Sequence, residues 1–322
     1  MRRPWGAEIF CMCAVRFSGP EPQPRKSPDI IMVGGGKGGV GKSCFSVNLS
    51  VAVAARGWRV ILLDADLSCA NAETLLGFRP KVSLDSFLRN REASDLASVV
   101  CDTPYPNLRL IPGTSGLLDV SHPSYQRRIA LIRGLRNLDA DLVVVDLDAG
   151  AHFTTLDFFR MKQAKGVVVI NPERTSIDNA FKFLRAAFFR HVERFYHSPE
   201  VGLLLKRNHT LPDFFECLEQ ASCFDVNLKE KIKTEIHQLA ATFKPQVVVN
   251  KVGTVYEAKV AANILSKYAR QHLLVEPDML GHIFFDGIVK ESVNCGIPFV
   301  HNHPKLQVSG CFSDMANRLG YF

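Results

Sequence analysis

The segment GGGKGGVGKS at 34–43 constrains the fold of this chain more than any other. It follows a short apolar run, IIMV, and precedes a helical pattern, FSVNLSVAVAARG. Within it Gly36, Gly41, Lys42 and Ser43 satisfy the spacing G-x-x-x-x-G-K-[ST] in a strand–loop–helix context. Glycines let backbone N–H groups turn inward around phosphate oxygens, and the helix N-terminus adds its positive dipole end. The segment therefore predicts a phosphate-binding loop between a strand and a helix.

The polar groups of this loop suit a nucleotide with a magnesium ion. Lys42 is expected to reach the β- and γ-phosphates, and the Ser43 hydroxyl is expected to ligate Mg²⁺. A glycine-rich turn without a ligand is the alternative, but the full motif in its context argues against it. The residues expected to line the nucleotide are Gly36, Lys37, Gly38, Gly39, Val40, Gly41, Lys42, Ser43 and Cys44.

Short apolar runs alternate with helical patterns from Asp29 onward. Runs that are apolar throughout are typical of strands covered on both faces. The predicted fold class is therefore α/β, a mostly parallel sheet between helix layers. The predicted strands are IIMV at 30–33, VILLD at 60–64, LRLI at 108–111, LVVVD at 142–146, GVVVI at 166–170 and VVVN at 247–250.

A long helical stretch separates the last two of these runs. Apolar residues recur there at helical spacing, and a second amphipathic segment extends from about Asn227 to Phe243. We expect a helical elaboration over about 177–243. Plain core is the expected role of the apolar stripe, and a groove for a partner is the alternative. The periodic residues are Ile177, Phe181, Leu184, Phe188, Val192 and Phe195.

The composition is that of an ordinary globular protein. Of 322 residues, 47% are hydrophobic and 22% are charged, which excludes collagen-like, disordered and disulfide-scaffold classes. The formal charge of +7 suits a phosphate-bearing ligand, DNA or an anionic membrane surface, without selecting among them. Nine cysteines are scattered singly, apart from Cys11 and Cys13, which favours a reduced, cytoplasmic chain.

Residues 1–28 are expected to form a disordered tail and linker. The stretch at 19–28 holds four prolines and no apolar residue, so it cannot bury a face. Glu8 interrupts the apolar run near the N-terminus, which leaves a signal peptide as the weaker alternative. Residues 29–322 are then expected to form one nucleotide-binding domain.

The phosphate loop carries a second lysine, Lys37, within KGGVGKS. In this respect the sequence resembles the deviant Walker A family of MinD, ParA and FlhG-type ATPases. The early lysine is that family's signature residue and reaches the nucleotide of the facing subunit in an ATP-bound dimer. Carried onto Lys37, the resemblance implies ATP and ADP as ligands, slow ATP hydrolysis and an ATP-dependent homodimer.

A first acidic segment, LLDADLSCAN at 62–71, matches the family's DxDxxxxN switch region. The resemblance implies that Asp66 positions the attacking water and that Asp64 supports the Mg²⁺ shell. Both follow a predicted parallel strand, at whose carboxyl end α/β folds bind ligands. A solvated acidic turn is the alternative, since D-x-D is a common pattern.

A second acidic segment, LVVVDLDAG at 142–150, contains Asp146 in the Walker B pattern, which holds Mg²⁺ directly or through water. It also resembles the family's D-x-x-[AG]-G segment, which implies that Gly150 senses the γ-phosphate. Asp148 departs from the Pro or Gly of most relatives. Its charge either acts near the phosphates or points into solvent.

Three further segments fit the resemblance. INPERTSIDNA at 170–180 resembles the MinD-type NPE-x-[TS]-S segment. VVVNK at 247–251 implies that Asn250 reads the adenine edge, since a carboxamide both donates and accepts. GHIFFDGIVKESVNCGIP at 281–298 keeps the family register, with Phe284 in place of a proline.

The leading functional expectation is a MinD/FlhG-like regulator of spatial positioning or flagellar number. The form of DADLSCANAETLLG and the NPE segment favour it over ParA. Such a regulator is expected to have an activating protein partner. Its expected location is the cytoplasm, with peripheral attachment to the inner membrane face as an option.

A ParA-like ATPase that binds DNA nonspecifically is the alternative. Its support is a basic cluster opposed in that region only by Glu193 and Glu200, although a solvated helix face is the simpler explanation. The cluster comprises Lys182, Arg185, Arg190, Arg194, Lys206 and Arg207.

An Mrp-type iron–sulfur carrier is a more remote alternative, because it shares the phosphate loop. Such carriers need cysteine ligands, commonly as C-x-x-C. The sequence has no C-x-x-C, so no iron–sulfur cluster is expected. Cys44, Cys69 and Cys295 are expected to be small buried hydrophobic residues.

Overall fold

The computed structural model describes residues 27–66, 70–89, 95–114, 125–151, 153–159, 161, 163–196 and 198–322. The expected tail, residues 1–28, lies outside the described residues except for Ser27 and Pro28. From Asp29 onward, strands and helices alternate along the chain, as the apolar runs predict.

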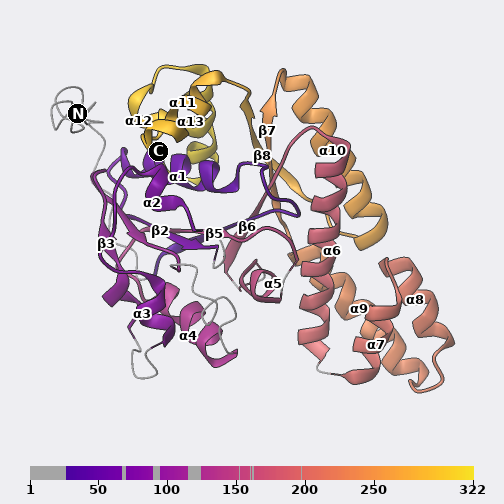
Figure 1. The fold of residues 1–322 in the computed structure, drawn as a ribbon. Coiled ribbons are helices and arrows are strands. Elements are labelled where there is room, and N and C mark those ends of the chain that lie inside the picture. The colour runs from indigo at the N-terminus through magenta and orange to yellow at the C-terminus, as the bar shows by residue number, and fades with distance from the viewer. Residues whose placement is uncertain are drawn as a thin grey trace, which may run out of the picture.

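An eight-stranded sheet lies at the centre of the molecule (Figure 1). Its strand order is β3-β4-β2-β5-β1-β6-β7-β8, and all neighbouring pairs are parallel except β3 and β4. The six predicted strands are confirmed as β1, β2, β4, β5, β6 and β7. The strands are β1 (Asp29–Gly34), β2 (Val60–Ala65), β3 (Cys101–Asp102), β4 (Leu108–Ile111), β5 (Leu142–Leu147), β6 (Ala164–Ile170), β7 (Gln246–Val252) and β8 (Asp278–Phe284).

Two strands escape prediction because neither contains a long apolar run. β3 has only two residues. In β8, whose sequence is DMLGHIF, Asp278, Gly281 and His282 interrupt the apolar residues. β8 nevertheless pairs with β7, with two register shifts, and forms one edge of the sheet.

Helices cover both faces of the sheet (Figure 1). α1, α2, α11, α12 and α13 lie over one face, and α3, α4, α5, α6 and α10 lie over the other. A short 3-10 helix, η1 (Leu96–Val99), precedes β3. The α-helices are α1 (Lys42–Ala54), α2 (Ala72–Leu75), α3 (Leu84–Arg89), α4 (Tyr125–Arg136), α5 (Phe153–Phe159), α6 (Arg174–Tyr196), α7 (Pro199–Arg207), α8 (Leu211–Gln220), α9 (Val226–Thr242), α10 (Val255–Leu273), α11 (Gly287–Cys295), α12 (Phe299–Asn302) and α13 (Gln307–Leu319).

The alternation of side chains along each strand divides the interior into two cores. In β1, Ile30 and Met32 belong to the core shared with α3 to α6, whereas Ile31 and Val33 belong to the core shared with α1 and α13. Successive side chains of a strand point to opposite faces, and all four are buried. The sheet is therefore covered on both sides, as parallel sheets usually are.

The strand order reverses at β1, which has β5 and β2 on one side and β6 and β7 on the other. In open α/β sheets, ligands bind outside the carboxyl ends of the strands at such a switch point. The glycine-rich loop connects β1 directly to α1. The fold thus places the predicted phosphate loop where this class of sheet binds ligands.

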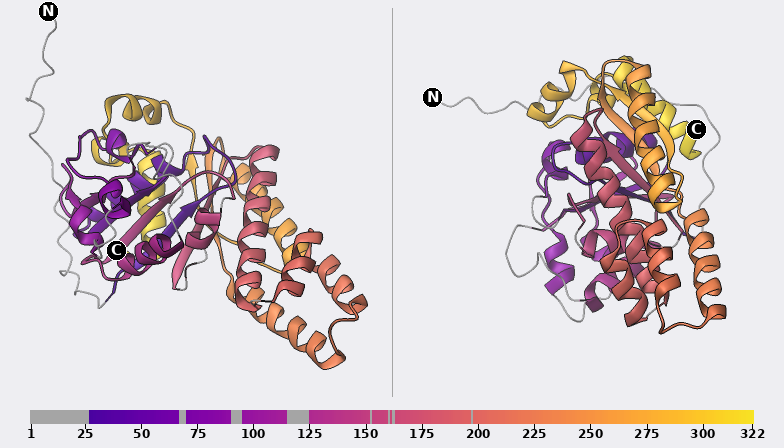
Figure 2. Two further views of the ribbon diagram at one scale, coloured as in Figure 1. Left: turned by 60° about the horizontal axis from the view of Figure 1, so that its bottom comes forward. Right: turned by 90° about the vertical axis from the view of Figure 1, so that its right-hand side faces the viewer.

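Helices α7, α8 and α9 extend beyond the sheet, below the end of α6 (Figures 1 and 2). The two predicted amphipathic segments are confirmed as α6 and α9. Most of the predicted stripe of α6 is core, with Leu184, Phe188 and Val192 fully buried. Phe195 is an exception: it is 49% exposed, because it lies in the last turn of the helix.

The basic cluster carries less uncompensated charge than the sequence predicts. The expectation that only Glu193 and Glu200 oppose it is wrong, because further acidic partners come from α5 and from the first turns of α6. The α5 carboxylate is distant in sequence, so periodicity gives no sign of it. Ion pairs join Arg190 and Arg194 to Asp157, Arg190 and Lys206 to Glu193, and Lys182 to Asp178.

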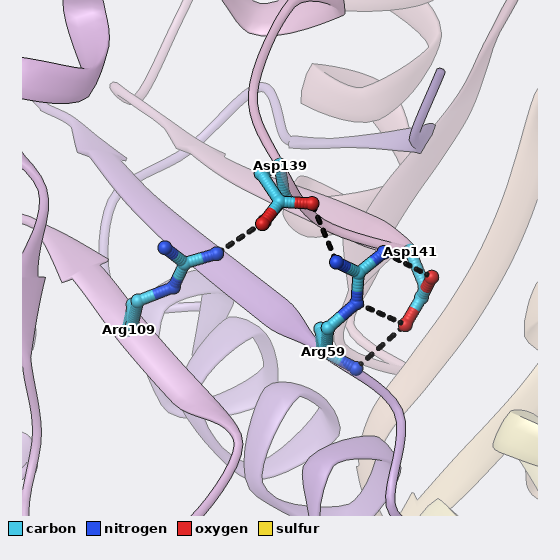
Figure 3. A network of polar contacts seen from close by, with 4 residues as sticks. All are labelled: Arg59, Arg109, Asp139 and Asp141. Carbon is cyan, nitrogen blue, oxygen red and sulfur yellow. Dashed lines mark hydrogen bonds and ion pairs between the residues drawn. The ribbon is translucent and has the colours of Figure 1, made fainter. Parts of the chain in front are cut away.

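An ion-pair network joins the amino-terminal ends of β2 and β5 (Figure 3). Arg59 donates to the Asp141 carboxylate from its backbone N at 2.9 Å, from Nε at 3.2 Å and from Nη2 at 2.9 Å. Arg59 also donates to the Asp139 carboxylate, and Arg109 donates to the Asp139 carbonyl. Asp141 is 1% exposed, so this bidentate pair offsets the cost of burying its charge.

Arg59→Ala is expected to lower the free energy of unfolding by about 1–3 kcal/mol, as measured by urea denaturation. The variant removes the guanidinium from a buried carboxylate, and the partial exposure of Arg59 keeps the loss below that of a fully buried pair. The matched control is Arg109→Ala, which loses a hydrogen bond to a carbonyl and should cost below about 1 kcal/mol. Equal losses in the two variants would contradict this account.

Candidate functional site

The glycine-rich loop forms an open turn at the N-terminus of α1. Gly39 and Gly41 have φ angles of 79° and 97°, in the left-handed region that favours glycine. Gly41 caps α1, and its carbonyl accepts a hydrogen bond from the backbone N of Phe45 at 2.9 Å. Lys37 and Gly38 are exposed, like Gly39. Such a turn, open to solvent at a helix N-terminus, is suited to binding phosphate.

The loop is tightly packed on one side and open on another. A Cβ atom on Gly36 would lie 1.9 Å from the carbonyl oxygen of Asn179 in α6. A Cβ atom on Gly41 would lie 2.3 Å from Nδ2 of Asn250. At Gly38 a Cβ atom would meet nothing within 4 Å. Glycine is therefore required by backbone packing at Gly36, whereas at Gly41 its φ of 97° adds to a contact with the end of the Asn250 side chain.

Three residues predicted to act together meet below the loop: Lys42, Ser43 and Asp146. The Asp146 carboxylate is 1% exposed and accepts a hydrogen bond from Oγ of Ser46 at 3.0 Å. The Ser43 hydroxyl also hydrogen-bonds Asp146, and the charge of the buried Lys42 lies close enough to favour its ionised form. Ser46 was not singled out by the sequence, because it lies outside the motif, one helical turn after Ser43.

Asp64 lies beside Asp146 on the neighbouring strand and is fully buried. Its carboxylate accepts three backbone hydrogen bonds, from the N–H groups of Asp66 at 3.1 Å, Asn71 at 2.8 Å and Ala72 at 2.9 Å. Asp64 therefore ties the segment after β2 to the start of α2. This positioning role has no counterpart in the sequence pattern, which indicates only a metal-shell role.

The two neighbouring carboxyl groups both resist ionisation. Burial, followed by repulsion from Asp146, raises the pKa of Asp64 to about 7. Burial also raises the pKa of Asp146, while the hydrogen bonds from Ser43 and Ser46 and the charge of Lys42 oppose the rise. A nearby divalent cation would favour the ionised forms.

The stability of the nucleotide-free protein is expected to fall as the pH rises from about 4 to about 7. Because folding raises the pKa of Asp64, the folded state binds more protons than the unfolded state in this window. The stabilisation is complete below the unfolded pKa and is lost as the pH passes the folded value. Asp64 should contribute at most about 1.4 kcal/mol per pH unit to the slope, in addition to any contribution from Asp146, measured by urea denaturation with a chelator. Asp64→Asn should make the slope smaller, whereas the exposed Asp102→Asn should leave it unchanged.

Asp66 and Asp148 lie at the mouth of the site and are partly exposed. The charge of Asp66 contributes to the raised pKa of Asp146, so the two carboxylates are close. The Asp148 carboxylate accepts a hydrogen bond from the backbone N of Ala149 at 2.5 Å. Asp148 thus engages its own loop. Residues 67–69, including Cys69, lie outside the described part of the chain.

Gly150 joins the second acidic segment to the phosphate loop. Its backbone N donates a hydrogen bond to the carbonyl of Gly35 at 3.1 Å, and its φ angle is 93°. This hydrogen bond therefore couples the conformation of the phosphate loop directly to that of the second acidic segment.

Asn250 and Lys251 contact the loop from the end of β7. Asn250 Nδ2 donates to the Val40 carbonyl at 2.8 Å, and its Oδ1 accepts from the Lys251 backbone N at 2.9 Å. One N–H and one lone pair of the carboxamide remain for a ligand. The Lys251 Nζ donates to the Gly39 carbonyl at 3.3 Å. The sequence pattern does not single out Lys251, whose role depends on this long-range contact.

Lys37 pairs with the NPE segment after β6. Its Nζ lies 3.9 Å from Oε2 of Glu173, and both side chains are largely exposed. The backbone N of Asn171 donates to Oγ of Ser176 at 2.9 Å, which fixes the start of the segment. Lys37 thus lies on the outer edge of the loop, away from the buried Lys42.

The segment at 281–298 forms the end of β8 and α11. Asp286 caps α11 by accepting a hydrogen bond from the backbone N of Ile288 at 2.9 Å. Phe284, in place of the family's proline, packs edge-on against His282 with ring centroids 4.8 Å apart. Phe285 donates from its backbone N to the Val252 carbonyl at 2.9 Å, so the loop after β8 lies against the end of β7.

The donor set below the loop fits Mg²⁺. This ion prefers oxygen ligands and commonly takes one or two from carboxylates, with the remainder from phosphates and water. Ser43 and Asp146 supply a hydroxyl and a carboxylate that lie close together, and Asp64 lies alongside. Among the described residues no cluster of three or more His, Cys, Asp or Glu side chains forms a metal site.

The burial of two cysteines can be compared with the expectation that they are small buried hydrophobic residues. Cys295 is exposed, so its assignment as a buried hydrophobic residue is wrong; it is the last residue of α11, a helix without buried side chains. Cys44 is partly buried, and burial raises the pKa of its thiol to about 11. None of the helices in the described ranges is both long and apolar enough to cross a membrane.

Sequence comparison finds a family model that matches most of the chain and relatives that match about half of it. A model of the CobQ/CobB/MinD/ParA nucleotide binding domain matches residues 31–299. The antiactivator FleN of Pseudomonas aeruginosa is 36% identical over 182 residues, which cover 54% of this chain and 64% of that protein. The flagellum site-determining protein YlxH of Helicobacter pylori is 30% identical over 167 residues, 48% of this chain and 52% of that protein. The chain thus spans between about half and two thirds of these relatives.

A solved structure has the same fold. The septum site-determining protein MinD of Pyrococcus horikoshii, complexed with Mg-ADP, superposes with a TM-score of 0.61. The match covers 91% of this chain and 96% of that one, at 20% sequence identity. The predicted P-loop architecture, a mostly parallel sheet between helix layers, is therefore confirmed.

Proposed function

We propose, because this chain belongs to the CobQ/CobB/MinD/ParA nucleotide-binding domain family, that it binds ATP and hydrolyses it slowly as a nucleotide switch. The observation that carries the proposal is the meeting of Lys42, Ser43 and Asp146 below an open glycine loop at the switch point of the sheet. ATP favours a homodimer and ADP a monomer, so the bound nucleotide selects the state of the protein.

The reaction transfers the γ-phosphoryl group to water, which requires positioning and charge neutralisation more than covalent chemistry. Lys42 neutralises the β- and γ-phosphates, and N–H groups of the loop bind their oxygens. Asp66 orients the attacking water, and Gly150 responds to the γ-phosphate through its contact with Gly35. Lys37, at the exposed edge, reaches the nucleotide of the facing subunit.

Magnesium would be held by Ser43 and Asp146, with Asp64 in support. When bound, it supplies positive charge to the phosphates. Asn250 reads the adenine edge with the N–H and the lone pair that its contacts to Val40 and Lys251 leave available.

The cellular role we propose is regulation of spatial positioning or flagellar number, in the cytoplasm and with an activating protein partner. Its support is the similarity to FleN and to a flagellum site-determining protein. Nonspecific DNA binding has less support, because much of the basic cluster is paired with carboxylates. The sequence offers no C-x-x-C for an iron–sulfur role.

Size-exclusion chromatography with ADP and with ATP tests the switch. The wild type is expected to form a dimer with ATP only. Asp66→Ala should stay dimeric after ATP is added and should release phosphate at least about tenfold more slowly. Lys37→Ala should remain monomeric with ATP. Both side chains are partly or largely exposed, so neither variant should unfold.

The exposed Lys305→Ala serves as a matched control and should elute as the wild type does. Elution that does not depend on nucleotide in the wild type and in both variants would contradict the proposed switch. Phosphate release by Asp66→Ala at the wild-type rate would remove Asp66 from the mechanism.

A further inference from the structure

An apolar stripe on α10 is left uncovered by the rest of the described chain. Its members are between 38% and 78% exposed, and they recur at every fourth residue along the helix. Residues four apart are neighbours on a helix surface, so these side chains form one continuous ridge. The opposite face of α10 is buried in the core that the sheet shares with α6. The α10 stripe consists of Tyr256, Val260, Ile264 and Tyr268.

Tyr268, the last residue of the α10 stripe, packs against neighbouring rings. The ring of Tyr268 lies 6.1 Å from that of Phe181 on α6 and 6.3 Å from that of His272. From its first residue to its last, the stripe is about 18 Å long, the length of a helix of about 12 residues. A rigid apolar ridge of this length costs little ordering entropy when a second helix packs on it.

A shallow hollow, open to solvent, lies beside the α10 stripe. Its volume is about 440 Å³, and every residue that lines it comes from α10. Two of its side chains, Lys267 and Arg270, are cationic, and Arg270 is paired with Glu276. Within the described ranges, no acidic partner is found for Lys267 or for Lys259 on the same helix. The hollow is lined by Asn263, Ser266, Lys267, Arg270 and Gln271.

We propose that the α10 stripe and this hollow bind an amphipathic helix of a protein partner, with acidic residues beside its apolar face. Ridges of residues four apart pack into the matching grooves of a second helix, which is a common mode of peptide recognition. Apolar residues of the partner cover the stripe. Aspartate or glutamate residues reach Lys259 and Lys267, whose charges are otherwise uncompensated.

Two other occupants fit these features less well. A membrane surface can cover the α10 stripe, but its headgroups do not hold carboxylates at fixed positions beside Lys259 and Lys267, as a helix does. A second copy of this chain, packed stripe against stripe about a two-fold axis, would bring the basic flanks of both copies together. Like charges across an interface oppose association. A helix with acidic flanks satisfies both the apolar ridge and the cations.

Selection from a displayed library of amphipathic helical peptides tests this proposal. The apolar and the flanking positions are both randomised, and selection is made on the full chain without nucleotide, so that the result does not depend on ATP hydrolysis. We expect selected peptides to have apolar residues spaced three or four apart and an excess of Asp and Glu at the flanks. Their affinity should fall at least about tenfold in Ile264→Glu and in Lys267→Glu.

Leu203→Glu is the matched control, because Leu203 is 49% exposed on α7, away from the stripe. It should bind the selected peptides as the wild type does. Failure to select any peptide that depends on Ile264, or an excess of Lys and Arg at the flanks, would overturn the proposal. The proposal would also be overturned if the wild type floated with anionic vesicles, or formed a dimer in sedimentation, and Ile264→Glu alone abolished that behaviour.

Discussion

Replacement of Gly36 by alanine is expected to weaken ATP binding by at least about 100-fold. The new Cβ atom would lie 1.9 Å from the Asn179 carbonyl oxygen, which is a backbone atom inside α6 and cannot rotate away. Either α6 or the loop must shift, and the loop is the part without regular hydrogen bonds. The shift misaligns backbone donors, and hydrogen bonds to a charged group contribute about 1.5–3 kcal/mol each.

Gly38→Ala is the matched control for this experiment. It adds the same methyl group two residues away in the same loop, where a Cβ atom meets nothing within 4 Å. Titration with a fluorescent ATP analogue should give an affinity within about threefold of the wild type, which corresponds to below 1 kcal/mol. Thermal unfolding of both variants separates a local shift of the loop from loss of the fold. Similar affinities in the two variants would disprove the packing argument.

The parts of the fold that depend on local sequence could be predicted. Uninterrupted apolar runs identify strands such as β1 and β5, because a strand buried on both faces needs apolar side chains at every position. β8 was missed for the same reason, since Gly281 and His282 interrupt it. The order of the strands in the sheet could not be predicted from any single segment of the sequence. It depends on pairing between runs that are far apart in the chain.

The residues of the candidate site also fall into those that local sequence indicates and those that depend on long-range contacts. Lys42 and Ser43 could be identified because one loop and one helix turn fix their geometry, and the spacing of the motif records that geometry. The contact of Lys251 with Gly39 spans more than two hundred residues, so no local pattern reveals it. The three backbone hydrogen bonds to Asp64 depend on how the segment after β2 folds back. Asp64 and Asp66 belong to one motif, yet only the structure shows that Asp64 is buried and hydrogen-bonded to backbone N–H groups, whereas Asp66 is partly exposed.

The α10 stripe shows why an apolar pattern alone does not assign a role. Along α10, apolar side chains occupy both the buried face, which includes Ala261 and Leu265, and the exposed face, which includes Val260 and Ile264. The sequence gives no indication of which face packs on the sheet. Only the burial of each side chain in the folded structure distinguishes the two faces.

Lys42→Ala is expected to weaken ATP binding by about 100- to 1,000-fold, as measured by titration calorimetry with ATP and Mg²⁺. Lys42 is 8% exposed, so its charge acts on bound phosphates with little screening by water. Removing one partner of a buried charge pair typically costs 2–5 kcal/mol. The variant also removes the charge that favours ionisation of Asp146, so the pKa of that carboxyl should rise further. The apparent affinity for Mg²⁺ should therefore fall together with that for ATP.

Lys251→Ala is the control. The Nζ of Lys251 also lies at the loop, 3.3 Å from the Gly39 carbonyl, but the Lys251 side chain is exposed. Its effect should stay within about fivefold, in line with the small contribution of exposed charges. Circular dichroism melting in the absence of nucleotide establishes that both variants are folded. If Lys251→Ala weakens ATP binding as much as Lys42→Ala does, then burial does not decide which lysine carries the phosphate charge. A Lys42→Ala variant that keeps wild-type affinity would mean that the loop binds phosphate through its backbone alone.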